Sequence, residues 1–187
     1  MKAGVLALQG DFREHARVLE DLGTVPLLAR TADELAAVDC LAIPGGESTT
    51  MAKLARAHGL IEPLRERVAA GMPVFGTCAG MILMATEVTD GEPVLSLLDI
   101  RVIRNAYGRQ VDSFEADVDA PGVSDEPLRA VFIRAPVVET VGEGVEVLAE
   151  LRGAPILVEQ GNLLAAAFHP ELAGDARLHR RMLERVG

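Results

Sequence analysis

Four short apolar runs, separated by amphipathic segments, dominate the first 78 residues and limit the folds open to the chain. We expect buried strands at 2–9, 24–29, 40–43 and 73–75. Strands that alternate with helices at this spacing are joined by right-handed crossovers, so their sheet is parallel and has helices on both faces. Ligands of such sheets bind beyond the carboxyl ends of the strands. The loops that follow these runs are therefore the predicted position of a functional site.

Signals for helix ends lie between the runs. Asp11 and Glu14 have the spacing of a capping box, which predicts a helix over 11–22. Thr31 and Glu34 repeat the pattern. The further helices are predicted at 31–38, after Ser48, at 60–70, at 79–85 and at 175–186.

Beyond residue 88 the pattern changes to short β-like runs joined by turns. These runs lie at 97–104, 113–118, 128–133, 145–151 and 154–159, and a last strand is predicted at 163–168. They indicate a meander or antiparallel extension of the sheet. Because no repeat or linker interrupts the chain, residues 1–187 are predicted to form a single domain. The expected fold is a three-layer α/β/α arrangement with a mostly parallel central sheet and a small antiparallel extension.

Charge and composition exclude several classes of function. The formal net charge is −10, with 28 acidic against 18 basic side chains, and aromatic residues make up 3% of the chain. A phosphate backbone would be repelled on average and aromatic platforms for bases are scarce, so no nucleic-acid partner is expected. No apolar run approaches the roughly 18 residues that cross a bilayer, so no membrane association is expected and the protein is predicted to be cytoplasmic. Neither Cys-x-x-Cys nor His-x-x-x-His occurs, so no metal site is expected.

Cys78 stands between Gly76 and Gly80, where the fourth run passes into an apolar segment of helical character. A nucleophile on a strand-to-helix turn needs small residues two positions before and after it, because such a turn is crowded. The dipole at the start of the following helix favours a thiolate. An isolated motif of this kind is equally compatible with a buried structural cysteine. Cys40, inside an apolar run without glycine neighbours, is interpreted as a core residue.

A cysteine nucleophile needs a base, and His169 is the histidine that directly follows a predicted strand. It is therefore expected at the same edge of the sheet as Cys78. Glu171, two residues later, points the same way if the backbone is extended, and orients the imidazole. The other histidines occur among polar residues or near a helix end and are interpreted as surface side chains: His15, His58 and His179.

The tetrahedral intermediate of acyl transfer needs two backbone donors. The amide of Ala79, directly after the nucleophile, is one candidate. The second candidate is Gly46 in the loop 44–48, where glycine lets the backbone approach a substrate. The alternative is a plain strand-to-helix turn with Ser48 as the N-cap, and both roles are compatible.

Taken together, PGGEST at 44–49, GTCAG at 76–80 and HPE at 169–171 resemble the class I, triad-type glutamine amidotransferases. Three further segments are similar to the glutaminase subunits of pyridoxal 5′-phosphate synthase, the vitamin B6 branch of that family. They are LALQGDFREH at 6–15, RNAYGRQ at 104–110 and FIRAP at 132–136. The resemblance covers essentially the whole chain.

The resemblance implies that L-glutamine is hydrolysed through a thioester and that the ammonia passes to a separate (β/α)8-barrel synthase subunit, without a cofactor in the glutaminase. It gives Cys78, His169 and Glu171 the roles of the triad. It also places Gln9 and Gly10 near the oxyanion loop. The implied substrate contacts are Gly46, Glu47, Ser48, Arg104, Ile133 and Arg134.

Two alternatives remain at this stage. The chain is either a glutaminase serving another synthase, such as imidazole glycerol phosphate synthase, or a catalytically silent regulatory or cysteine-sensor protein on a similar sheet. All three triad positions are filled, which disfavours a catalytically silent protein. The presence of both PGGES and HPE disfavours a cysteine sensor. The isolated subunit is predicted to be a poor glutaminase, because ammonia released without a synthase would be wasted.

Overall fold

A seven-stranded sheet forms the centre of the computed structural model, which describes residues 1–104 and 113–187. Its strand order is β10-β11-β12-β4-β3-β1-β2. In chain order the strands are β1 (Ala3–Leu6), β2 (Leu27–Ala29), β3 (Cys40–Ile43), β4 (Val74–Thr77), β10 (Glu146–Leu151), β11 (Ala154–Gln160) and β12 (Leu163–Ala166). Neighbouring strands from β12 to β2 are parallel, whereas β11 and β10 add antiparallel pairs at one edge. The predicted parallel sheet with an antiparallel extension is confirmed.

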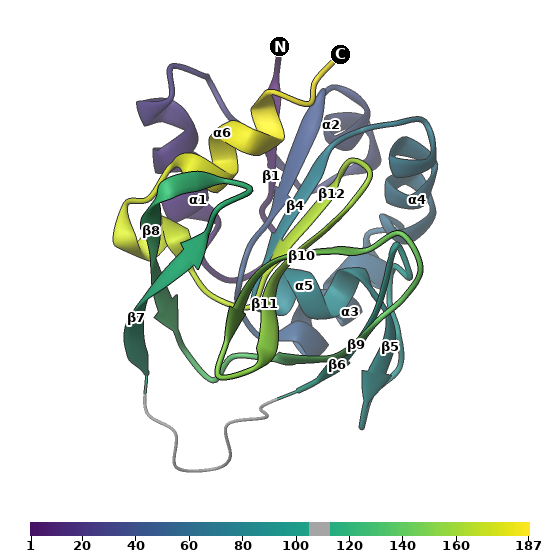
Figure 1. Cartoon of the computed structure of the whole chain (residues 1–187). Helices are drawn as coiled ribbons and strands as arrows, with labels where there is room; N and C mark the ends of the chain where they lie inside the picture. Colours follow the sequence, from purple (N-terminus) through teal and green to yellow (C-terminus); the bar gives the residue numbers. More distant parts are fainter. Residues whose placement is uncertain (105–112) are drawn as a thin grey trace.

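Helices cover both faces of this sheet (Figure 1). One face carries α1 (Phe12–Asp21) and α6 (Arg177–Leu183), which contact β1 and β4 respectively. The opposite side of the view holds the helices that follow β3 and β4. Those are α3 (Ser48–Ala57), α4 (Ile61–Ala69) and α5 (Ala79–Met84), and α2 (Ala32–Ala36) packs against α4.

The two predicted capping boxes have different outcomes. At α2 the Thr31 hydroxyl accepts from the Glu34 amide at 3.3 Å, and the Glu34 carboxylate accepts from the Thr31 amide at 3.0 Å. At α1 the prediction is wrong, because Asp11 makes no side-chain capping bond. Its carboxylate lies instead against a histidine at the carboxyl edge of the sheet.

Two small sheets flank the main one, and the sequence pattern anticipates them only in part. One contains β5 (Ala85–Thr89), β6 (Leu98–Ile103) and β9 (Val137–Val141), and the other pairs β7 (Phe114–Ala120) with β8 (Ser124–Phe132). Neither β5 nor β9 was expected, and β5 pairs parallel to β6. The apolar stretch before β5 continues the helical pattern up to the residue where the strand starts, which hides the boundary.

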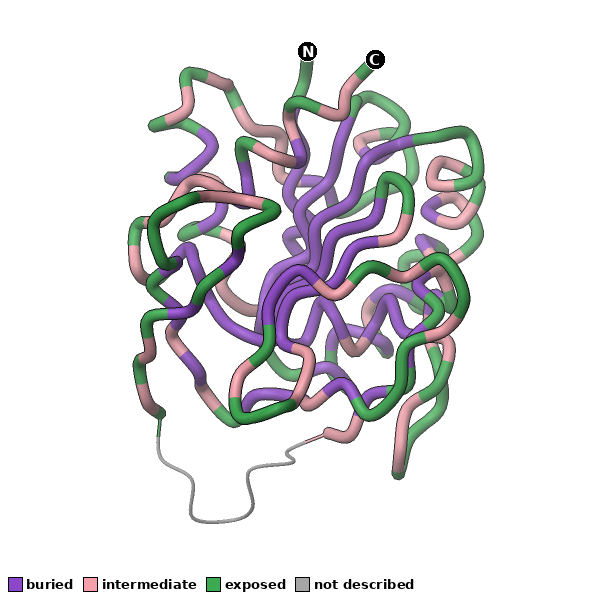
Figure 2. Tube along the Cα trace, viewed as in Figure 1, coloured by how far each residue is buried: buried purple, intermediate pink, exposed green. Residues whose placement is uncertain are grey.

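The core follows the parallel strands, which Figure 2 shows as a continuous buried centre. Cys40 is fully buried, as its interpretation as a core residue predicts, and burial together with nearby Asp39 raises its pKa to about 11. The stacked rings of Phe114 and Phe132, with centroids 4.6 Å apart, link the two strands of the β7–β8 hairpin, and Phe132 contacts Phe168 of the core at 5.7 Å between centroids. Within the described ranges, no helix combines the length and the apolar character needed to cross a membrane.

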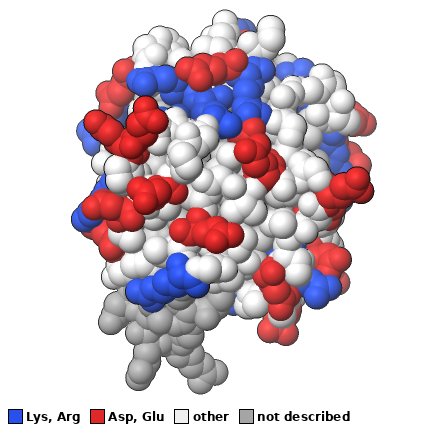
Figure 3. All heavy atoms as spheres, in the orientation of Figure 1, with Lys and Arg blue, Asp and Glu red and all other residues white. Residues whose placement is uncertain are grey.

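Charge on the surface is mixed. On the face shown in Figure 3, basic side chains gather near the chain ends with acidic groups beside them. Arg177, in α6, pairs with Asp175 at 2.6 Å, and Arg181 and Arg185 both pair with Glu159. Each of these arginines is thus paired with a neighbouring carboxylate, and Arg181 and Arg185 share that of Glu159.

Candidate active site

Cys78 occupies a strained turn between β4 and α5. Its φ and ψ are 48° and −102°, a conformation that side-chain-bearing residues rarely adopt. A methyl group at Gly76 would lie 2.9 Å from the carbonyl carbon of Gly80, and one at Gly80 would overlap the carbonyl oxygen of Ile43. The Cys78 amide donates to Ala166 of β12 at 2.8 Å, which fixes the turn to the sheet. The sequence therefore folds here into the turn expected for a nucleophile.

His169 follows β12, the strand next to β4, and reaches the same edge of the sheet. Its amide donates to Val131 at 2.8 Å, and Nδ1 lies 2.7 Å from Oε1 of Glu171 on the short 3-10 helix Pro170–Ala173. The bond at Nδ1 leaves Nε2 free to exchange a proton with a thiol. His169 and Glu171 are 3% and 5% exposed, so this contact is shielded from water.

The charged forms of His169 and Glu171 stabilise each other. Burial alone would lower the pKa of His169, but bonds with Asp11, Cys78 and Glu171 outweigh it and raise that pKa to about 12. Burial would likewise raise the pKa of Glu171, yet His15 and His169 hold it below its ordinary value. The pair is therefore an imidazolium and a carboxylate, and an imidazolium stabilises a neighbouring thiolate.

Asp11 contacts His169, although the sequence pattern predicts it to cap a helix. Its Oδ2 lies 3.1 Å from Nδ1 of His169, so the imidazole faces two carboxylates. This contact is the physical reason that Asp11 does not cap α1. Among the described residues, Asp11, His169 and Glu171 are also the group of donors close enough to hold a metal ion. An imidazolium between two carboxylates accounts for these separations by itself.

Two of the three histidines predicted at the surface are buried, so that interpretation is wrong for His15 and His179. Both side chains are 0% exposed, and Nδ1 of His15 lies 2.8 Å from Nε2 of His179. The charged neighbours of each residue suggested a polar surface, but α1 and α6 turn these positions towards β4. His58, at the end of α3, is exposed as predicted.

The glycine-rich loop after β3 packs closely on the loop after β1. A methyl group at Gly46 would lie 2.5 Å from Oε1 of Gln9, and the same oxygen accepts from the amide of Glu47 at 2.7 Å. The predicted proximity of Gln9 to this loop is therefore seen. Gly46 and Ala79, the candidate oxyanion donors, line the same cleft as Cys78.

That cleft has a volume of about 320 Å³ and brings together all the residues predicted to bind substrate. They are Gly46, Glu47, Ser48, Arg104, Ile133 and Arg134, beside Cys78, Ala79 and His169. The Cys78 thiol faces the carbonyl of Ile133 at 3.9 Å. Arg134 has a φ of 45°, a second strained position in the wall. Of the RNAYGRQ segment, residues 105–110 lie outside the described part of the chain.

Two charged residues of the cleft, Glu47 and Arg104, are held at the start of α3. Glu47, not Ser48, is the N-cap, because its carboxylate accepts from the amides of Thr49 and Thr50. The Thr50 hydroxyl is the main reason that the pKa of Glu47 falls to about 2. Arg104 donates to the Thr49 hydroxyl at 3.0 Å and lies 3.7 Å from Glu47.

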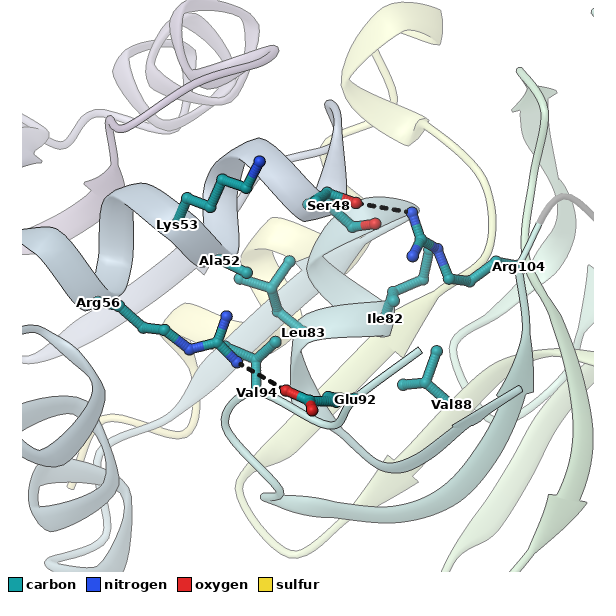
Figure 4. Close-up of a pocket in the computed structure, with 11 residues that line it drawn as sticks. Ser48, Ala52, Lys53, Arg56, Ile82, Leu83, Val88, Glu92, Val94 and Arg104 are labelled. Carbon is teal, nitrogen blue, oxygen red and sulfur yellow. Dashed lines mark hydrogen bonds and ion pairs between the residues drawn. The ribbon is translucent and has the colours of Figure 1, made fainter. Parts of the chain in front are cut away.

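Arg104 also borders a second hollow of about 190 Å³ (Figure 4). Figure 4 shows its guanidinium directed to the start of α3, with Arg56 and Glu92 paired at 4.0 Å across the hollow. Lys53 lies on the same side of α3. The two hollows share Ser48, Ile82 and Arg104, so they adjoin each other at the start of α3.

The sequence matches the SNO glutamine amidotransferase family over residues 5–187. The chain belongs to this family. The assignment confirms the predicted class of glutamine amidotransferases and the predicted fold.

Several known proteins are similar to this chain over nearly their whole length. The chain is 57% identical to the pyridoxal 5′-phosphate synthase subunit PdxT of Frankia alni, over 99% of this chain and 94% of that protein. It is 60% identical to PdxT of Acidothermus cellulolyticus, over 95% and 90%. A crystal structure of a glutamine amidotransferase, 50% identical, superposes with a TM-score of 0.94 over 99% and 98% of the two chains. The structure of PurLQS from Thermotoga maritima, 17% identical with a TM-score of 0.70 over 100% and 98%, shares the fold alone.

Proposed function

We propose that this chain is the glutaminase subunit of a pyridoxal 5′-phosphate synthase and hydrolyses L-glutamine to L-glutamate and ammonia. The observation that carries the proposal is the convergence of Cys78 and His169 in one cleft, with Glu171 buried behind them at 2.7 Å from His169. The strained turn at Cys78 and the names of the similar proteins support it.

The proposed reaction is acyl transfer through a covalent thioester. Cys78 Sγ attacks the side-chain amide carbon of glutamine, and His169 transfers the thiol proton to the departing ammonia. Water then attacks the thioester while His169 acts as the base, which releases glutamate and restores the thiol. Glu171 holds the imidazole by its Nδ1 in both steps.

The remaining residues of the cleft bind the glutamine substrate. The amides of Gly46 and Ala79 stabilise both oxyanions. Arg104 and Arg134 supply positive charge for the α-carboxylate of glutamine, and the Glu47 carboxylate accepts hydrogen bonds from its α-ammonium group. Ser48 and Ile133, which line the same cleft as Cys78, complete the substrate contacts.

We further propose that the ammonia passes to a (β/α)8-barrel synthase partner and that residues 1–187 act as a single glutaminase domain in the cytoplasm. The two unpaired cysteines suit a reducing compartment. The free subunit is expected to turn over slowly, since its product is useful only to that partner. No cofactor enters the mechanism.

Glutamate release by the complete synthase, with and without the Cys78→Ala substitution, tests the proposal. The substitution should abolish release while leaving the fold and the association of the subunits intact. Cys40→Ala is the matched control, because it removes the buried thiol away from the cleft. Glutamate release that survives Cys78→Ala would refute the mechanism. Absence of pyridoxal 5′-phosphate from the products would instead point to another synthase.

A further inference from the structure

A pair of buried imidazoles lies directly behind the triad and has no role in the reaction described above. His15 belongs to α1 and His179 to α6, the two helices on one face of the sheet (Figure 1). Both side chains are completely buried, and their ring centroids are 4.9 Å apart. Two titratable rings in such a position need a reason, because burying polar groups costs free energy unless they form hydrogen bonds.

The hydrogen bonds of the pair determine where its protons lie. Burial lowers the pKa of His179 to about 3, so this ring is neutral at physiological pH. Its Nδ1 has no partner among the described residues, and a buried lone pair without a partner is tolerated better than a buried N–H without one. The single proton of His179 therefore lies on Nε2 and is donated to Nδ1 of His15 at 2.8 Å. His15 accordingly carries a proton on Nε2.

The N–H group at Nε2 of His15 lies close to both Thr77 and Glu171. Nε2 lies 3.0 Å from Oγ1 of Thr77, the residue immediately before Cys78. It also lies 3.5 Å from Oε1 of Glu171, the oxygen that contacts Nδ1 of His169. The ring thus touches the strand end that carries the nucleophile and the carboxylate that orients the base.

We propose that His15, oriented by His179, is a positioning residue that fixes the Cys78 turn and the Glu171 carboxylate relative to each other. The inference rests on the proposed glutaminase function. Thr77 takes the shorter contact and the carboxylate the longer one, so a single N–H restrains both groups. The residues that line the cleft do not include His15, so its removal should affect the rate of the chemical step more than the binding of glutamine.

The test compares His15→Leu with His15→Gln in the complete synthase, with kcat and KM for glutamine measured by glutamate release. His15→Leu removes both ring nitrogens and should lower kcat about tenfold to a hundredfold while KM stays within about twofold. His15→Gln keeps an N–H donor near the position of Nε2 and should recover kcat to within about threefold of the wild-type value. His179→Leu, which removes the donor to His15, should give an intermediate kcat.

His58→Leu is the matched control, because it removes an exposed histidine at the end of α3. Circular dichroism and thermal unfolding establish that each variant is folded. An unchanged kcat in folded His15→Leu would overturn the proposal, as would a His15→Gln variant that is equally impaired. If His15→Leu does not fold, wild-type kcat in His179→Leu would overturn it. A wild-type synthase that releases no glutamate refutes the proposed function instead, so the two failures are distinguishable.

Discussion

The two walls of the cleft differ in how their polar groups are held. On the triad wall, Cys78 and His169 are 7% and 3% exposed, and Glu171 behind them is 5% exposed, so their contacts lie in the protein interior. On the substrate wall, the side chains of Glu47 and Arg104 are 53% and 28% exposed and pair with each other at 3.7 Å. Under the proposed function, the groups of the triad are thus arranged before glutamine arrives, whereas Glu47 and Arg104 must exchange partners when it binds.

The difference suits the role that the proposed function gives to each wall. Groups that stabilise a transition state act best when they are fixed and shielded from water, since reorganisation during the reaction is then avoided. Charges that capture a substrate from solution must first be reachable. Substitutions on the triad wall should therefore reduce kcat, and those on the substrate wall should raise KM.

The largest expected effect is that of Glu171→Gln. The amide has nearly the shape of the carboxylate but does not stabilise the imidazolium of His169, so kcat should fall by about 10³-fold or more. KM for glutamine should change little. Steady-state kinetics of the complete synthase measure both constants. A kcat loss below tenfold would show that the triad wall is less dependent on this contact than its burial indicates.

Gly80→Ala should disturb the triad wall through the backbone. Its added methyl group would overlap the carbonyl oxygen of Ile43, so the turn at Cys78 must shift. We expect the free energy of unfolding to fall by about 1–3 kcal/mol and most of the glutaminase activity to be lost. Urea denaturation and glutamate release measure the two effects. Gly122→Ala is the control, because the nearest atom to its methyl group would be a Leu148 carbon at 3.4 Å.

Arg104→Ala should act on the substrate wall. The loss of one charged hydrogen-bond donor to the substrate carboxylate, worth about 1.5–3 kcal/mol, should raise KM about tenfold to a hundredfold. The kcat at saturating glutamine should remain near the wild-type value. Exposed ion pairs contribute little to stability, so the unfolding transition should hardly move. A large fall in kcat with unchanged KM would contradict the expected difference between the two walls.

The smallest expected effect is on acid stability. In the folded state the pKa of Glu171 lies below its ordinary value. Its carboxylate therefore contributes its full stabilisation at pH values above the ordinary pKa, and this contribution is lost as the pH falls through the folded pKa. The free energy of unfolding should therefore decline below about pH 4.5, and Glu171→Gln should decline less steeply. The raised pKa of His169 acts oppositely, with its contribution present below about pH 6.5 and lost only as the pH rises towards 12.

Urea denaturation between pH 7 and pH 3 measures this slope, and Glu143→Gln serves as the exposed control. Parallel slopes for the wild type and Glu171→Gln would contradict the expected contribution of the buried pair.

The sequence was most informative where a chemical role needs a particular local backbone. The glycines around Cys78, the polar residues after strand ends and the apolar runs predicted the parallel sheet and the grouping of the triad. The roles of the site residues remain predictions. The pattern failed where a polar residue has two competing partners. Asp11 has the spacing of a cap but contacts His169, which is distant in sequence and reaches it only through the pairing of the strands.

The burial of His15 and His179 could not be predicted from the sequence pattern either. His15 and His179 are surrounded in sequence by charged residues, and their mutual contact depends on how α1 and α6 pack, which local periodicity does not encode. The strand β9 was missed for a related reason, because its pairing partner β6 is distant in sequence, whereas β5 was missed because the helical pattern before it runs up to its first residue.

The close packing of glycines beside the cleft bears on how this protein tolerates sequence change. A methyl group at Gly10 would overlap the Gly45 carbonyl, one at Gly45 would overlap the His169 ring, and one at Gly46 would press on Gln9. In a library that samples every amino acid at these three positions, functional clones should retain glycine at each. Variation that alters substrate preference must therefore come from the outer residues of the cleft, where side chains have room to change.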